Sequence, residues 1–334
     1  MINYSNTERL IKALKREQVD RVPVTSLLTA VTTELMEKSR IYWPPAHNNA
    51  EQMVGLSASA YEYAGIESLK VPFDMTVEAG ALGCDVDYGS MDTLPQVRGH
   101  KFNEPEELII GRQILDKGRI PLVLKAIEIA KKKYGNVIPV VSSIVGPFSL
   151  ASKLFGFDEF LTWIILEPSK LTTVLDKLTD LCIMYANEQV NAGCDVVLVG
   201  EAACSGDLIS SESYGKFIAP CHKKLCSSIN IPTVIHICGN ITGHLEYFQE
   251  TGMSGISFDE KTDVKAVVEK LKGKVALCGY IDTLGILLNG TPDDVYKKSM
   301  ECIKAGVDIL NAGCSWPPYV KLENIKAMVK AVRQ

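Results

Sequence analysis

The sequence predicts an α/β protein whose parallel strands close into an eight-stranded (β/α)8 barrel, the TIM barrel. Three observations favour this fold. Short runs rich in β-branched residues alternate with amphipathic stretches, which is typical of parallel strands joined by crossover helices. The strand candidates stay apolar until their C-terminal ends, where a barrel has its catalytic face. No G-x-G-x-x-G or P-loop motif follows a strand, which disfavours the alternative of a doubly wound open sheet.

The predicted elements can be followed along the chain. Residues 1–20 should contain a helix that packs across the barrel floor, and residues 80–119 indicate an irregular excursion with a small hairpin and a short helix. The strand candidates are residues 21–28, 68–74, 136–146, 194–202, 233–239, 255–258, 275–282 and 307–314. The later helix candidates, at 169–193, 211–230, 263–274 and 291–306, often end near a glycine, as helix C-caps do. A barrel of 334 residues fits in one domain, 1–334.

The composition excludes several classes of partner. The chain has 35 Lys and Arg against 40 Asp and Glu, a net charge of -5, and no long basic block, so we expect no nucleic acid partner. No run approaches the roughly 18 apolar residues of a membrane helix, and the start of the chain lacks an apolar signal core. We therefore expect a cytoplasmic protein with no membrane partner, whose ten cysteines are reduced.

Polar residues end the last five strand candidates. Along the chain they are Glu201, then His236 and Cys238, then Asp259 and Glu260, then Tyr280 and Asp282, then Cys314. Because the strand ends of a barrel converge, these side chains are expected around one mouth.

Three of these residues could bind zinc. His236 and Cys238 are two residues apart on one strand, so their side chains point to the same face. Barrel closure can bring Cys314 to them, and three N/S ligands with an open fourth position are the catalytic form of a zinc site. The alternative is a core histidine bonded to backbone and cysteines that only pack.

The charge of such a site indicates its chemistry. Two thiolates and a neutral imidazole would leave Zn²⁺ formally neutral, which makes it a weak activator of water. A substrate thiol at the open position would instead lose its proton and stay nucleophilic. Glu260, or less readily Asp259, could be the fourth ligand until substrate arrives.

Other histidines and cysteines are weaker candidates. Cys221 and Cys226 of "PCHKKLC" diverge on a helix because they are five residues apart, and His222 between them is expected on a solvated face. His244 is expected in an exposed first helical turn, with a role in supporting the metal ligands as the alternative.

Cations that could bind an anionic substrate are few. No arginine lies between Arg119 and Arg333, so the half of the barrel with the metal candidates has no guanidinium clamp, and a polyanionic substrate is not expected. A single anionic group could bind to Lys70, Arg98, Arg112 or backbone N–H groups, and the sequence does not rank them.

Six segments spread over nearly the whole chain carry a family resemblance: "DRVPV", "YWPPAHNNAEQM", "VGPFSLASKLFG", "IHICGN", "LLNGTPDDV" and "LENIKAMVKAV". Together they resemble the uroporphyrinogen decarboxylase superfamily, and within it the branch of cobalamin-dependent methyltransferases that includes methylcobamide:coenzyme M methyltransferase. The zinc motif of that branch, H-x-C-xn-C, is matched by His236, Cys238 and Cys314.

The resemblance implies a (β/α)8 barrel in which Zn²⁺ activates a small thiol, usually coenzyme M. The thiolate takes the methyl group from methyl-Co(III) of a methylcobalamin-type corrinoid and leaves Co(I), a step of methanogenesis or other one-carbon metabolism. The chain has no D-x-H-x-x-G module, so a corrinoid protein is the expected partner. Glu201, Ser205 and Asp207 are candidates for contacting substrate or corrinoid, with loop capping as the alternative.

The sequence also departs from the branch at the mouth. It has "NAGCSWPP" where relatives often have P-G-C-x-x-x-P, and "GYID" and "GEAACSGD" differ as well, so the acceptor is left open. Tyr280 and Trp316 are expected to line the mouth, although Trp316 could equally be a packed lid, and Tyr280 is also a candidate catalytic residue. The R-x-x-x-Q-A-G-R stretch of the decarboxylase is missing, so decarboxylation of uroporphyrinogen is not expected.

Two other functions stay open. The transfer could run the other way, from a methylated nitrogen, oxygen or sulfur compound to Co(I). The chain could also be a non-catalytic barrel that binds a corrinoid or tetrapyrrole and has a structural zinc.

Overall fold

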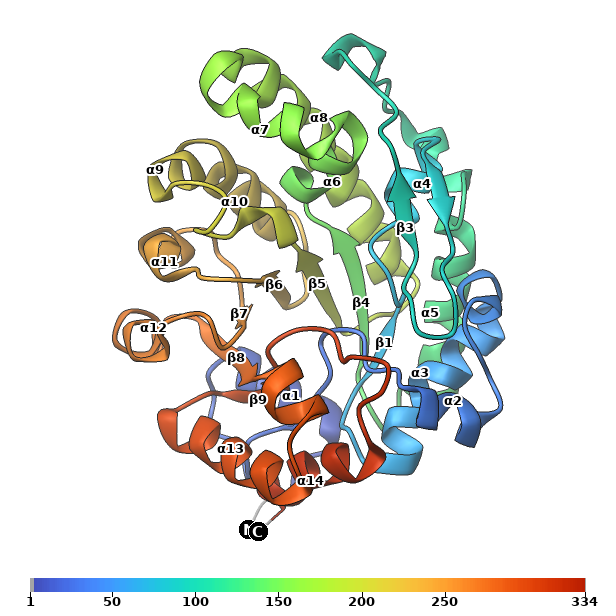
Figure 1. Cartoon of the computed structure of the whole chain (residues 1–334), viewed down its shortest axis with the longest axis vertical. Coiled ribbons are helices and arrows are strands. Elements are labelled where there is room, and N and C mark those ends of the chain that lie inside the picture. The colour runs from blue at the N-terminus through green and yellow to red at the C-terminus, as the bar shows by residue number, and fades with distance from the viewer. Residues whose placement is uncertain (1–2, 334) are drawn as a thin grey trace.

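Seven parallel strands curl into a half-barrel with helices on its outer side (Figure 1). In the computed structural model, which describes residues 3–333, their order is β1-β4-β5-β6-β7-β8-β9 and every neighbouring pair is parallel. The strands are β1 Leu69–Val71, β4 Val140–Val145, β5 Val196–Gly200, β6 Thr233–Ile237, β7 Gly255–Phe258, β8 Ala276–Ile281 and β9 Ile309–Ala312. The predicted α/β class with parallel strands is confirmed.

The prediction of a first strand at residues 21–28 is wrong. These residues form an extended segment between β9 and β1 that makes one parallel bridge, from Val24 to Leu310. On the other side the Val24 carbonyl accepts from the Glu67 amide at 2.8 Å, but the Val24 amide faces the Glu67 side chain at 3.4 Å. Because this amide has a side-chain partner instead of a backbone one, no ladder forms. In residues 3–333 the parallel sheet has seven strands, and this segment lies between β9 and β1, where the eighth strand was predicted.

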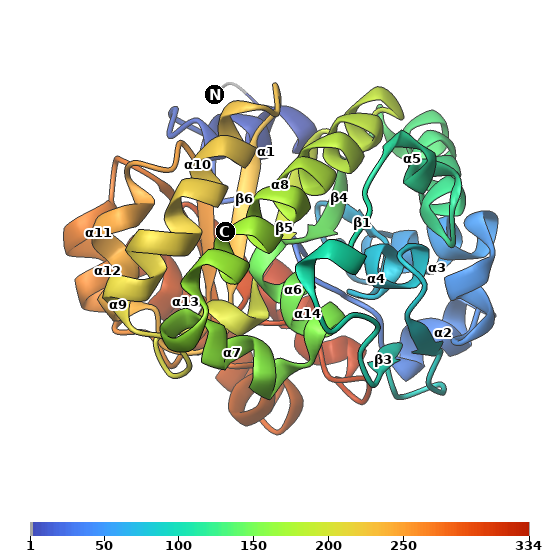
Figure 2. The same cartoon turned by 90° about the horizontal axis from the view of Figure 1, so that it is seen from above.

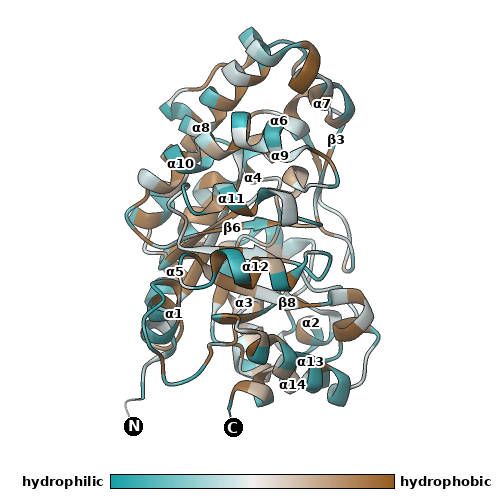
Figure 3. Ribbon diagram, turned by 90° about the vertical axis from the view of Figure 1, so that its left-hand side faces the viewer, coloured by the Kyte–Doolittle hydropathy of each residue, from teal (hydrophilic) through white to brown (hydrophobic). Residues whose placement is uncertain are grey.

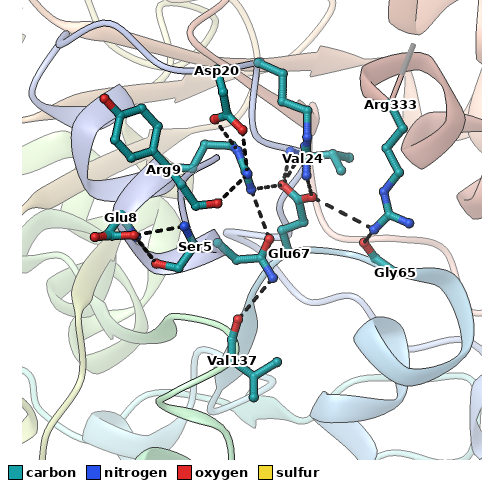
Figure 4. A network of polar contacts seen from close by, with 12 residues as sticks. Ser5, Glu8, Arg9, Asp20, Val24, Gly65, Glu67, Val137 and Arg333 are labelled. Atoms are coloured by element: carbon teal, nitrogen blue, oxygen red, sulfur yellow. Dashed lines mark hydrogen bonds and ion pairs between the residues drawn. The ribbon is translucent and has the colours of Figure 1, made fainter. Parts of the chain in front are cut away.

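A network of buried charges fastens this segment at the floor of the barrel (Figure 4). Arg9 donates to both oxygens of Asp20, at 2.8 and 2.9 Å, and lies 3.6 Å from Glu67. Arg21 donates to the same Glu67, whose side chain is only 1% exposed. The network thus ties the first helix, the extended segment and the start of β1 together.

The helix α1, Asn6–Leu14, closes the floor. It begins with a capping box, in which the Ser5 hydroxyl accepts from the Glu8 amide and the Glu8 carboxylate accepts from the Ser5 amide. Its apolar face packs on inward-facing residues of the strands; the cluster is Leu10, Ala13, Leu14, Leu27, Leu28, Val141, Val196, Leu198, Val234, Ala276, Cys278 and Ile309. The predicted helix across the floor is confirmed, and side chains fill this end of the barrel.

The helices α3, α5, α8, α12 and α13 pack on the outer side of the sheet (Figure 2), and α12 and α13 present hydrophilic residues outward (Figure 3). The helices are α2 Thr33–Ser39, α3 Ala50–Ala64, α4 Val77–Ala81, α5 Ile120–Tyr134, α6 Pro147–Phe155, α7 Phe157–Leu166, α8 Pro168–Asn191, α9 Ser211–Ser213, α10 Ala219–Ser227, α11 Leu245–Phe248, α12 Val264–Leu271, α13 Pro292–Ala305 and α14 Leu322–Val332. Among the helices in residues 3–333, none has the length and apolar character needed to cross a membrane.

The excursion predicted at residues 80–119 contains an antiparallel hairpin of β2, Asp85–Asp87, and β3, Gln96–Arg98. Two 3-10 turns follow it, Pro105–Glu107 and Arg112–Asp116. The turn of the hairpin reaches the segment after β9, where the Tyr319 hydroxyl donates to Asp92 at 2.6 Å. The hairpin therefore lies at the same end of the barrel as the C-terminal ends of the strands.

Candidate metal centre

Three side chains at the ends of β6 and β9 lie together at the mouth of the barrel. The ligand atoms of His236, Cys238 and Cys314 all lie within 4.8 Å of one another. His236 Nε2 is 3.0 Å from the Cys238 sulfur, which is 3.5 Å from the Cys314 sulfur. In residues 3–333 this is the one group of three or more such ligands. The structure thus brings together the three residues that strand parity and barrel closure predicted.

The loop after β6 is built to present Cys238. Gly239 adopts φ +81°, and a Cβ there would lie 2.6 Å from the Asp207 carboxylate, so this position needs glycine. Its amide donates to Asp259 at 2.6 Å, and the next amide, of Asn240, donates to Asp207 at 3.0 Å. Asp207 and Asp259 therefore position the loop that follows Cys238.

The two cysteine sulfurs are hydrogen-bonded to each other at 3.5 Å. This contact, together with His236, lowers the pKa of Cys314 although burial opposes it. The same contact and burial raise the pKa of Cys238. A cation bound between the two sulfurs would stabilise both thiolates.

These residues fit Zn²⁺. One imidazole nitrogen and two thiol sulfurs are the donor types that zinc prefers, and both cysteines are only partly buried, so a fourth ligand can enter. The second ring nitrogen of His236 is 3.1 Å from the Ser257 hydroxyl, on the neighbouring β7. A metal-bound histidine uses its second nitrogen for such a hydrogen bond. Ser257 is a residue that the sequence did not single out.

Neither predicted carboxylate belongs to this cluster. Asp259 already accepts two backbone amides, of Gly239 and Lys261, at 2.6 and 3.0 Å. Glu260 is exposed, and its carboxylate lies close to Gly313, the residue before Cys314. Burial raises the pKa of both carboxyl groups. The identity of a fourth ligand stays a prediction, for which Glu260 is better placed than Asp259.

The position of Tyr280 contradicts its predicted place at the mouth. Its ring stacks on Phe258, with centroids 5.7 Å apart, and the Lys298 ammonium of α13 lies 5.1 Å from its centroid. Burial raises its pKa to about 12. The Tyr280 ring therefore packs between Phe258 of β7 and Lys298 of α13, which are an aromatic and a cationic partner. Trp316 is 4% exposed and is a packed side chain, the alternative that the sequence left open.

Glu201 is fully buried and serves as a helix cap. One carboxylate oxygen accepts from the Phe148 amide at 3.2 Å and from His222 Nε2 at 3.1 Å, and the other accepts from the Ser149 amide at 2.9 Å. The expectation that His222 is solvated is wrong, because Glu201 and the Tyr214 hydroxyl, at 2.8 Å, satisfy both ring nitrogens. This arrangement favours the capping alternative for Glu201 over contact with substrate.

His244 is also buried, in contrast to the exposed turn expected for it. Its ring stacks on Tyr214 at 4.5 Å, and its Nε2 is 3.1 Å from the Cys204 carbonyl. Ser205 and Asp207 flank the loop of Cys238, where Asp207 is exposed and Ser205 is buried. For these two residues, contact with substrate or corrinoid stays a prediction.

A cavity of about 210 Å³ lies beside the cluster of His236, Cys238 and Cys314, and His236 lines it. It extends from His236 and Ser315 on one side to residues of and after β1 on the other, and apolar side chains form much of its wall. The lining residues are Leu28, Thr29, Lys70, Phe73, Asp74, Met75, Glu78, Leu94, Pro95, Ser143, Ile144, Val145, Leu198, Gly200, His236 and Ser315. A larger hollow of about 610 Å³ around Arg112 shares none of these residues.

The acidic residues of this cavity were not identified from the sequence. Asp74 receives two hydrogen bonds from the Arg119 guanidinium, at 2.7 and 2.9 Å; although burial opposes it, Arg119 and His47 hold the pKa of Asp74 well below its usual value. Burial raises the pKa of Glu78 to about 7. Asp74 ends the predicted strand 68–74, so the same rule that identified Asp259 could have identified it.

A parallel barrel with a cluster of one histidine and two cysteines at its mouth defines the class of protein, and comparison with known proteins defines the family. A family model described as "Uroporphyrinogen decarboxylase (URO-D)" matches residues 5–334, and the chain belongs to this family. It is 34% identical to "Methylcobamide:CoM methyltransferase MtbA" of Methanosarcina acetivorans, over 100% of this chain and 99% of that protein. It is 33% identical to "Methylated-thiol--coenzyme M methyltransferase" of Methanosarcina mazei, over 98% and 89%.

A solved structure described as "methyltransferase from Methanosarcina mazei" superposes with a TM-score of 0.95, at 36% identity and over 98% of both chains. The resemblance to the methyltransferase branch of the family is thereby confirmed, as is the barrel fold.

Proposed function

We propose that this chain transfers a methyl group between a corrinoid on a partner protein and a small thiol, such as coenzyme M, that is activated by zinc. The observation that carries the proposal is the cluster of His236, Cys238 and Cys314, open to solvent on one side and bordering a small cavity on the other. The names of the relatives, which are methyltransferases of methylcobamide and coenzyme M, support the same reaction.

The chemistry that zinc supplies when bound is to lower the pKa of the incoming thiol while leaving its sulfur nucleophilic. The chain prepares the place for it. Ser257 orients the His236 ring, and Asp259 fixes the turn after Cys238. Leu28, Phe73 and Leu198 line the cavity and limit water around the reacting sulfur. The corrinoid can approach from the solvent side, where both cysteines are partly exposed.

The dimensions of the cavity support a small acceptor. At about 210 Å³ it is smaller than the roughly 300–1,000 Å³ of pockets for drug-sized ligands. Arg119 is bound to Asp74, which leaves Lys70 as the one Lys or Arg in the lining that the structure describes. This does not suit a tetrapyrrole with many carboxylates, as uroporphyrinogen decarboxylation would require. The ten free cysteines fit a reducing compartment such as the cytoplasm.

The reverse direction is a second candidate, favoured by one observation. A full-length relative is named for a methylated thiol as donor, so a methylated sulfur compound could give its methyl group to the corrinoid at the same centre. Transfer to a thiol and transfer from its methylated form use the same pocket.

The experiment that tests the proposal uses zinc-loaded protein, methylcobalamin and 2-mercaptoethanesulfonate without oxygen. We expect loss of methylcobalamin absorbance with formation of the methylated thiol. Cys314→Ser should lose both zinc and turnover, whereas Cys84→Ser, at a partly buried cysteine remote from the cluster, should keep both. Tightly bound zinc without transfer in either direction would contradict the proposal and support a non-catalytic barrel.

A further inference from the structure

Another cavity, of about 390 Å³, adjoins the one that His236 lines. We call it the hairpin cavity, because it lies between β3 of the hairpin and α6, the helix that follows β4. Met75 and Pro95 line both cavities and therefore form the partition between them. The hairpin cavity is thus part of the mouth of the barrel, and a large molecule bound over the cluster of cysteines can extend into it.

One cation in the hairpin cavity has no partner. Lys153, on α6, is half-buried, and within residues 3–333 its ammonium takes part in no hydrogen bond or ion pair. Burial lowers the pKa of Lys153, while the charges of Glu78 and Asp74, neither of which pairs with it, act in the opposite direction. A partly desolvated ammonium with free donors is costly, and an acceptor group on a ligand would offset that cost.

The rest of the lining adds one more free donor and no acid. The side chain of Gln96, exposed on β3, forms no hydrogen bond with the residues that the structure describes. The Thr76 hydroxyl, by contrast, donates to Asp74 at 2.6 Å, and the Ser152 hydroxyl donates to the Ser149 carbonyl at 2.9 Å. Among residues 3–333, no Asp or Glu lines this cavity. It therefore suits a ligand that presents oxygen acceptors, neutral or negative.

A corrinoid has such acceptors at its edge. The cavity that His236 lines, of about 210 Å³, is smaller than pockets for drug-sized ligands, so a corrin ring has to stay outside it, over the mouth. The edge of the ring carries amide side chains and, in cobalamins, a nucleotide with a phosphate. When the cobalt lies above the reacting sulfur, this edge spreads over the surrounding loops and reaches the hairpin cavity.

Other loops of the mouth offer such an edge less. The loops after β5 and β8 present Asp207 and Asp282, each of which accepts a backbone amide at 3.0 Å. Glu260, after β7, is exposed, and so is its neighbour Lys261. An exposed cation gains little from a new partner, because water already solvates it. The half-buried Lys153 is therefore the cation of the mouth that gains most from a corrinoid acceptor.

We propose that Lys153 and Gln96 bind the edge of the corrin, through its amide carbonyls or its nucleotide phosphate, and so hold the cobalt over the candidate metal centre. The inference rests on the proposed function and adds the place where the methyl donor is bound. Both side chains act on the orientation of the ring, and the thiol binds in the other cavity, so the two substrates are recognised by separate residues.

The test is equilibrium dialysis of methylcobalamin and of methylcobinamide against zinc-loaded protein, in the dark and without thiol. Methylcobinamide keeps the ring amides but lacks the nucleotide and its phosphate. Because a hydrogen bond from a charged group contributes about 1.5–3 kcal/mol, Lys153→Met should weaken methylcobalamin about 10- to 100-fold. Gln96→Leu, which removes a neutral donor at an exposed position, should weaken it about 2- to 10-fold. An equal loss for both corrinoids indicates contact with the amides, and a loss for methylcobalamin alone indicates the phosphate.

The matched control is Lys265→Met, at an exposed lysine of α12, which should bind both corrinoids as the wild type does. Affinity for 2-mercaptoethanesulfonate should stay unchanged in all three variants, whereas a general loss of structure would lower it. If Lys153→Met loses the thiol as well, the result for Gln96→Leu decides, since its side chain is exposed and not needed for folding.

No binding of either corrinoid by the wild-type protein would overturn the inference. So would wild-type affinity for both corrinoids in Gln96→Leu and in a folded Lys153→Met. The outcome is separable from that of the proposed function. Bound methylcobalamin without methyl transfer to a thiol contradicts only the function, and methyl transfer with the same KM for methylcobalamin in every variant contradicts only the role of the hairpin cavity.

Discussion

The buried carboxylate of Glu201 gives a prediction that separates a structural role from a catalytic one. In Glu201→Gln the shape is kept, but one accepting oxygen becomes an NH₂ group. If the oxygen of the new side-chain amide keeps the hydrogen bonds from Phe148 and His222, its NH₂ group faces the Ser149 backbone amide. Both groups are then hydrogen-bond donors. The loss of one hydrogen bond to a charged group and the unpaired buried amide together cost about 3 kcal/mol. For a protein of this size, that corresponds to a fall in Tm of about 4 °C.

The assay is thermal unfolding followed by circular dichroism, with zinc content measured in parallel. Glu212→Gln is the matched control, since Glu212 is exposed nearby on α9 and should leave Tm unchanged. We expect Glu201→Gln to unfold earlier while still binding zinc, because the side chain does not touch the metal ligands. A variant with wild-type Tm and a lower rate of methyl transfer would refute the capping role and restore the interpretation that Glu201 contacts substrate.

Three further predictions follow from single contacts. Ser257→Ala removes the partner of His236 Nδ1, so zinc affinity should fall about 10- to 100-fold in competition with a chelator; unchanged affinity would contradict the support role. Lys70→Met should raise stability at pH 7 by about 3 kcal/mol, because burial lowers the folded pKa from its ordinary value of 10.5 to about 8. The unfolded chain keeps the Lys70 proton to higher pH than the folded protein does. The stability gained by Lys70→Met should therefore shrink from pH 8 and vanish above about 10.5 in thermal melts. A stability difference that does not change with pH would be inconsistent with a buried cation. Tyr319→Phe removes an exposed hydrogen bond to Asp92, so Tm should change by less than about 2 °C while a protease cleaves the hairpin turn faster; unaltered cleavage would show that this contact does not hold the hairpin.

The cluster of His236, Cys238 and Cys314 was predictable because each step depends on backbone geometry alone. The alternation of side chains along a strand puts His236 and Cys238 on one face, and the convergence of strand ends brings Cys314 to them. Neither step requires knowledge of which helix packs where.

The surroundings of the centre were not predictable in the same way, because they depend on contacts between distant residues. His222 lies on a helix with polar neighbours, which suggested exposure, but its partner Glu201 comes from the end of β5. For Tyr280 the alternation rule failed near the end of β8, where the ring contacts α13. The prediction of a strand at residues 21–28 failed for a local reason. The Val24 amide is hydrogen-bonded to the Glu67 side chain, and no sequence pattern predicts that contact.

The central claim is that a substrate thiol binds to a zinc ion held by His236, Cys238 and Cys314. Zinc X-ray absorption of the loaded protein, before and after addition of 2-mercaptoethanesulfonate, tests it most directly. We predict one nitrogen at about 2.0 Å and two sulfurs at about 2.3 Å before addition, and a third sulfur at the same distance afterwards. A sulfur count that does not change on addition of the thiol, or a zinc ion with no sulfur ligand, would contradict the account.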